Sequence, residues 1–193
     1  MKHTITAADI LPMSEYLKVR TEKRRAIIAA KHHRQIPIGP YAMVTFENYD
    51  SMWLQIQEML YIEKGGAEQL VDELAAYNPM IPKGDELTAT IMFEIDDPIL
   101  RKKTLTELGR VEYSCFIRFD GEKIIGVPED DTDRTNEEGK TSSVHFLHFP
   151  FTSAQKRKFA TAHEIEMGFT HPHYGHIARF SMSTRDALLP DFA

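Results

Sequence analysis

The chain has 193 residues, of which 42% are hydrophobic and 27% are charged, and its formal net charge is −6 at pH 7. This length suits one hydrophobic core, so we predict a single domain over 1–193. The acidic balance argues against a nucleic-acid-binding surface, and no apolar run reaches the roughly 20 residues of a membrane-spanning helix. The single cysteine excludes an internal disulfide and a cysteine-rich metal site. Without an apolar leader segment, the expected location is the cytoplasm.

The N-terminal part, over about 1–80, predicts mainly helices. Thr6 and Asp9 have the spacing of a capping box, and 13–34 lacks glycine and proline, which predicts a long helix. Its segment 18–34 is strongly basic. Such a run is usually a solvated helix face, and the alternative is a docking surface for an anionic partner.

A second helix is predicted over 52–62, with Asp50 or Ser51 as its N-cap. It is apolar almost all round, which is typical of a helix buried centrally or at a subunit interface. Glu63 continues one of its apolar stripes. This carboxylate is therefore either drawn into water at a fraying helix end or buried with a partner.

The part over about 81–193 predicts mainly strands. Residues 88–95 alternate between two faces, Asp97 caps a helix that begins at Pro98, and Asp120–Gly121 turns a hairpin that buries Cys115. The acidic stretch 128–141 predicts a loop. Further strands are expected at 142–151, 163–169 and 177–181, with helices at 152–160 and, capped by Ser183, at the C-terminus.

This order of elements predicts the α+β class. We expect an antiparallel or mixed β-sheet of about five to six strands. The long N-terminal helix, the buried central helix and several short helices pack against it.

Two groups of histidines could carry chemistry. His145 and His148 stand in an aromatic run that predicts an interior strand, so they point to opposite faces and at most one serves a given site. His171, His173 and His176 follow one another in a loop-like segment, where such spacing suits a transition metal. Carboxylates would complete a site that favours iron or manganese, and the candidates beside the apolar helix are Glu47, Glu58 and Glu63.

Other chemistry finds less support in the sequence. There is no G-x-G-x-x-G, P-loop or G-x-S-x-G motif, so we expect no nucleotide cofactor and no serine hydrolase. A metal-free enzyme with His148 or His171 as a general base is a weaker alternative.

Four segments together resemble an uncharacterised bacterial family, Domain of Unknown Function 3501. They are FENYDSMWLQIQEMLYIEKGG, DELAAYNPMIPKGDELTATIMFEI, DRTNEEGKTSSVHFLHF and HPHYGH. The family carries no established activity, but its members are often encoded beside rubrerythrin-like and iron–sulfur proteins, which implies iron handling or peroxide defence by association. The residues that match the family pattern are His148, His171, Tyr174, His176, Glu47, Asn48, Glu58, Tyr61 and Glu63.

We therefore predict a metal-binding protein, with iron or another divalent metal, in redox or oxidative-stress metabolism. The alternative is a non-catalytic interaction or homodimeric module, in which the apolar helix forms a homo-oligomer interface and the basic helix docks an acidic redox or iron–sulfur protein. The predicted metal ligands are His148, His171, His176, Glu47, Glu58 and Glu63.

Overall fold

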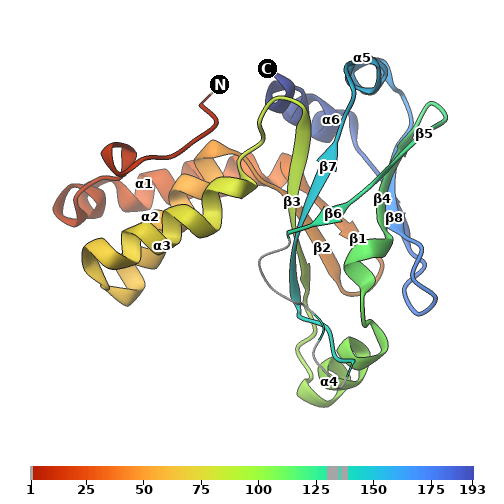
Figure 1. Cartoon of the computed structure of the whole chain (residues 1–193), viewed down its shortest axis with the longest axis horizontal. Helices are drawn as coiled ribbons and strands as arrows, with labels where there is room; N and C mark the ends of the chain where they lie inside the picture. The colour runs from red at the N-terminus through yellow and green to blue at the C-terminus, as the bar shows by residue number, and fades with distance from the viewer. Residues whose placement is uncertain (1, 130–134, 136–138) are drawn as a thin grey trace.

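The structure is a computed structural model that describes residues 2–129, 135 and 139–193. In the described residues a helical arm projects from two antiparallel sheets (Figure 1), which confirms the α+β class. None of the described helices is long and apolar enough to cross a membrane. The arm consists of α1 (Met13–Lys31), α2 (Tyr49–Glu63) and α3 (Gly66–Tyr77).

Asn48 caps α2, so the predicted caps Asp50 and Ser51 were wrong. The Asn48 side chain accepts a hydrogen bond from the backbone N–H of Ser51, and the Ser51 hydroxyl accepts one from the backbone N–H of Asn48. This reciprocal pattern is a capping box, in which Ser51 takes the third helical position instead of the cap.

The helix α2 is buried or partly buried from Ser51 to Tyr61. Met52 and Ile56 pack with Ile5, Met80 and Ile81 in a small hydrophobic cluster inside the arm. Near the end of the helix, 64% of Ile62 is exposed. The predicted burial of this helix is therefore confirmed over most of its length, and a subunit interface at its exposed end stays a prediction.

The described strands form two sheets, where the sequence predicted one. In both sheets all neighbouring strands are antiparallel. The first sheet has the order β1 (Gln35–Ile38), β2 (Ala42–Phe46), β3 (Glu86–Phe93), β7 (Val144–Pro150), β6 (Val127–Pro128). The second has the order β5 (Glu122–Ile125), β4 (Cys115–Phe119), β8 (Ile165–Phe169), β9 (Ile177–Arg179).

The main hydrophobic core lies between the two sheets and contains residues of both. In β3 the predicted alternation is confirmed, since Ala89, Ile91 and Phe93 are buried in this core. Cys115 is buried there too, and burial raises the pKa of its thiol, so it is no nucleophile.

Apart from the cap of α2, the turns and caps agree with the sequence except at the last helix. Asp120 and Gly121 both have positive φ, as a two-residue hairpin turn requires. The cap of the last helix is Ser181 and not Ser183, because the Ser181 hydroxyl accepts the N–H of Thr184. The remaining helices are α4 (Pro98–Glu107), α5 (Ser153–Thr161) and α6 (Met182–Leu188).

The strand β7 confirms that the two histidines of the aromatic run serve opposite faces. His145 is fully buried, and its Nε2 donates to the carbonyl oxygen of Ser142 at 2.9 Å. His148 lies on the other face of the sheet, opposite Thr88 of β3 and Val127 of β6. The predicted loop 128–141 lies partly outside the described residues.

The guanidinium of Arg34 joins the arm, the first sheet and the C-terminal segment. Arg34 is only 5% exposed. It donates to the carbonyl oxygens of Phe46 and Glu47, each at 3.0 Å, and of Ala187 at 2.6 Å, and it forms an ion pair with the buried Asp191. A buried cation with this many acceptors sets the position of every segment that it contacts.

We predict that Arg34→Met lowers the free energy of unfolding by about 3–5 kcal/mol, because it leaves the Asp191 carboxylate buried without its cation. Urea denaturation measures the loss. The control is Arg179→Met, which removes ion pairs of a side chain that is 67% exposed and should cost less than about 1 kcal/mol. Equal losses in the two variants would contradict the prediction.

Candidate functional site

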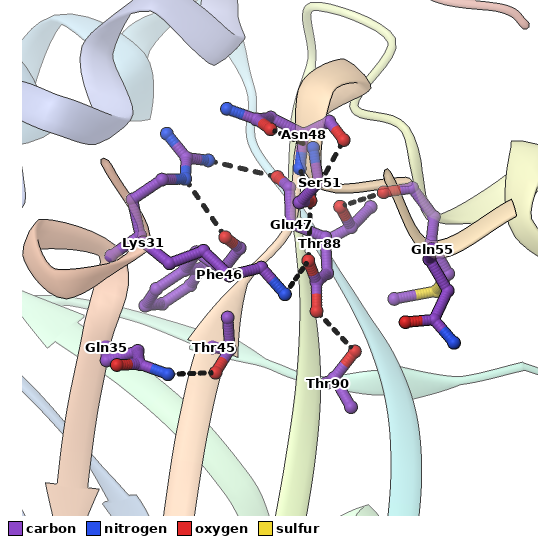
Figure 2. Close-up of polar contacts among 12 residues, drawn as sticks. Lys31, Gln35, Thr45, Phe46, Glu47, Asn48, Ser51, Gln55, Thr88 and Thr90 are labelled. Carbon is purple, nitrogen blue, oxygen red and sulfur yellow. Dashed lines mark hydrogen bonds and ion pairs between the residues drawn. The ribbon is translucent and has the colours of Figure 1, made fainter. Parts of the chain in front are cut away.

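Glu47 lies at the joint between the arm and the first sheet (Figure 2). It follows β2 and precedes the cap of α2, and its carboxylate is buried. The carboxylate accepts hydrogen bonds from the hydroxyls of Ser51 at 2.6 Å and Thr90 at 2.8 Å, and Lys31 Nζ lies 3.5 Å away. These contacts fasten the start of α2 and the end of α1 to β3.

A hollow of about 350 Å³ opens beside this joint, between α1 and the start of α2. Lys23 and Lys31 stand on the α1 side, and Asn48, Asp50 and Trp53 on the α2 side. Lys31 already faces Glu47, and Asp50 adds a negative charge. The hollow therefore has mixed charge and selects no ligand class by electrostatics alone.

Glu58 forms an ion cluster between α1 and α2. Arg20 donates to both of its carboxylate oxygens, at 2.8 and 2.7 Å, and lies 4.1 Å from the Tyr61 ring centroid. Arg24 lies at 3.6 Å, and the Tyr16 hydroxyl donates to the same carboxylate. The hydrogen bonds from Arg20 lower the pKa of Glu58. This carboxylate therefore holds two helices together.

Glu63 lies at the last position of α2 and is exposed. Its carboxylate accepts a hydrogen bond from Gln69 Nε2 at 3.1 Å. Of the two alternatives for Glu63, the structure supports the acid in water at the helix end.

The HPHYGH segment packs against the turn between β1 and β2. The Tyr174 hydroxyl donates to the carbonyl of Ile38 and accepts from the N–H groups of Tyr41 and Ala42. The ring of His176 lies so close to Gly39 that a Cβ there would be 2.5 Å from it, and Gly39 also has a φ of +64°. Both features require glycine in the turn.

His171 lies on the same segment but faces another part of the chain. Its Nε2 donates to the carbonyl oxygen of Gly109, at 3.2 Å. The segment thus contacts both the turn between β1 and β2 and the backbone at Gly109 through hydrogen bonds.

His148 is flanked by two carboxylates that sequence reasoning missed. Its Nδ1 lies 2.7 Å from Glu86 Oε2, and its Nε2 is hydrogen-bonded to Glu129. The hydrogen bond to Glu86 is the main cause that raises the pKa of His148 above its ordinary value of 6.5, and Glu129 adds to it. Glu86 lies two residues before Thr88, which faces His148 across β3 and β7, so only the strand register could have revealed the pair.

The six predicted metal ligands lie at separate places in the structure. Glu47, Glu58 and His148 each have different ion-pair partners, and Glu63 and His171 have separate hydrogen-bond partners. Among the described residues, no three histidine, cysteine or acidic side chains are grouped so that they could hold a metal ion. The predicted set therefore does not form one site here, and metal binding itself stays a prediction.

The fold and the ion pairs described above define a class: a two-sheet α+β protein whose helical arm is fixed to the sheets by buried and partly buried ion pairs. The chain belongs to the family described as "Protein of unknown function (DUF3501)", whose model matches residues 4–192. It is also similar to a solved structure, described as a novel protein of unknown function from Burkholderia pseudomallei K96243. The two share 34% identity with a TM-score of 0.91, over 98% of this chain and 100% of that one. No curated protein matches significantly.

We predict that His148 stabilises the fold more at acidic than at alkaline pH. Because its folded pKa is raised above 6.5, its contribution is complete below pH 6.5 and is lost as the pH rises through the folded pKa. The difference in unfolding free energy between the wild type and His148→Gln should therefore shrink between pH 6 and pH 9. His163→Gln, at an exposed histidine, is the control. A difference that stays constant or grows over this range would contradict the prediction.

Proposed function

We propose that the protein is a non-catalytic binding module whose helical arm docks an acidic partner protein. The observation that carries this proposal is the charge and exposure of α1. This helix of 19 residues contains six lysines or arginines and two glutamates, on a chain of net charge −6, and it buries only Tyr16. Positive charge is thus concentrated on one element that faces solvent.

The cations of α1 divide into two groups. Arg20 and Arg24 contact Glu58, and Lys31 contacts Glu47, so these three are engaged inside the protein. Lys18 and Arg25 belong to the exposed group: the Lys18 side chain is 67% exposed and pairs only with the exposed Glu15 of the same helix, at 2.7 Å. Outward cations attract an oppositely charged surface and accelerate its association.

The ion clusters of Glu47 and Glu58 support this function because they hold α1 in position. They tie α2 to α1 and to the sheet, so the basic surface is presented by a fixed scaffold. A surface that is held in place before binding loses less conformational entropy when a partner docks.

An iron-dependent redox function remains a separate proposal. The six predicted metal ligands do not lie together among the described residues, and metal binding itself has not been measured. Elemental analysis of protein purified without an affinity tag tests it. A redox or iron–sulfur protein as the acidic partner, and a homo-oligomer, likewise remain proposals from the sequence.

We expect the protein to bind poly-L-glutamate at low ionic strength, with an affinity that falls as salt is added. Reversing two outward charges in Lys18→Glu/Arg25→Glu should weaken binding about tenfold, since each exposed ion pair contributes up to about 1 kcal/mol. The matched control is Lys102→Glu/Lys103→Glu on α4, with the same change in net charge. Isothermal titration calorimetry measures the affinities.

Two outcomes would count against this function. An equal loss of affinity in the α4 control would show that net charge, and not α1, governs binding. Tighter binding of a single-stranded DNA oligonucleotide than of poly-L-glutamate would replace the acidic protein with a nucleic acid as the partner class.

A further inference from the structure

The hollow between α1 and the start of α2 has the size and the lining of a small-ligand site. Its volume of about 350 Å³ falls within the range of about 300–1,000 Å³ that is typical of such sites. On the α1 side, Ala26, Ile27 and Ala30 provide aliphatic surface, and on the α2 side Tyr49 and Trp53 provide aromatic rings. The hollow can therefore hold a small apolar group, and its charged lining decides which ligand carries that group.

Two of the cations in this lining are neutralised within the protein. The charged side chains that line the hollow are Lys23, Lys31, Arg34 and Asp50. Lys31 contacts the carboxylate of Glu47 (Figure 2). Arg34 forms its ion pair with the buried Asp191. Neither Lys31 nor Arg34 therefore offers an uncompensated charge to a ligand.

Lys23 and Asp50 keep free charges of opposite sign. Within the part of the chain that the structure describes, neither side chain forms an ion pair or a hydrogen bond. Lys2 lines an adjoining hollow together with Asp50, but it is paired with Asp9 at 2.7 Å. Since Lys23 stands on α1 and Asp50 on α2, a simple anion or a simple cation in the hollow would meet a like charge on one side.

Trp53 adjoins both free charges. Asp50 precedes it by three residues in α2, so the two side chains share a face of that helix. Lys23 Nζ lies 6.0 Å from the centroid of the Trp53 ring. The ring is held in place, because its Nε1 donates a hydrogen bond to the carbonyl oxygen of Asp9 at 2.9 Å. The indole therefore provides a fixed apolar surface next to both charges.

We infer that this hollow binds a free α-amino acid with an apolar side chain. The ammonium group of the ligand pairs with Asp50, its carboxylate pairs with Lys23, and its side chain packs on Trp53 and the aliphatic surface of α1. Asn48 also lines the hollow, and because its Oδ1 accepts the backbone N–H of Ser51, its amide nitrogen is left to donate to the ligand carboxylate. Mixed charge becomes selective here because one molecule must satisfy both signs around an apolar group.

Four small molecules separate the contributions of the ligand groups. L-leucine carries both charges and an apolar side chain, isocaproate lacks the ammonium group, isoamylamine lacks the carboxylate, and glycine lacks the side chain. Trp53 is the only tryptophan of the chain, so its fluorescence reports binding in this hollow directly. We expect L-leucine to bind about tenfold more tightly than each of the other three.

Two substitutions assign the charges of the ligand to their partners. Lys23→Met should remove the preference for L-leucine over isoamylamine, because the carboxylate loses its cation, and should keep the preference over isocaproate. Asp50→Asn should do the reverse. Lys102→Met on α4 and Asp72→Asn on α3 make the same charge changes at exposed positions outside the hollow, and they should leave all four affinities unchanged. Circular dichroism checks that the variants are folded.

Three results would overturn the inference. They are equal affinities for L-leucine and its two single-charge analogues, preferences that both Lys23→Met and Asp50→Asn retain, and no saturable binding of L-leucine by fluorescence or calorimetry. The outcome is independent of the proposed docking of an acidic partner, because neither Lys18 nor Arg25 lines the hollow. Lys18→Glu/Arg25→Glu should therefore bind L-leucine as the wild type does.

Discussion

The buried guanidinium of Arg34 is the interaction on which the rest of the structure depends. Arg34 ends the short 3-10 turn His32–Arg34 that follows α1, and its acceptors lie at the end of β2, in α6 and at Asp191 near the C-terminus. A cation taken out of water is tolerable only when several acceptors surround it, so these segments hold one another in place. The direction of the helical arm relative to the sheets follows from this junction.

Two further acids complete the attachment of the arm. Glu47 joins α2 to β3, and Glu58 joins α2 to α1. Tyr174 and His176 similarly hold the turn of Gly39 against the sheet region. These polar residues therefore stabilise the fold, because buried polar groups require specific partners.

The two most polar features of the molecule have different physical roles. The Glu86–His148–Glu129 cluster lies within the first sheet and links β6 to β3 and β7 through groups that titrate. The basic surface of α1 faces solvent and is supported by ion clusters beneath it. The first feature makes local stability depend on pH, whereas the second provides a recognition surface whose strength depends on salt.

Local patterns in the sequence were sufficient for much of the fold. The capping box at Thr6, the cap at Asp97, the alternation in β3 and the turn at Asp120–Gly121 depend on neighbouring residues, so the sequence indicated them correctly. The same holds for the opposite directions of His145 and His148, which follow from the two-residue period of a strand.

Only the tertiary structure decided how many sheets form, which segments pack against α2, and which acid meets which cation. Arg20 and Glu58 are 38 residues apart in the chain, His148 and Glu86 are 62 apart, and Arg34 and Asp191 are 157 apart. The sequence alone determined the local elements and the residues able to ionise. Their partners depended on contacts between distant segments, because a buried charge is stabilised by whichever group the completed fold places beside it.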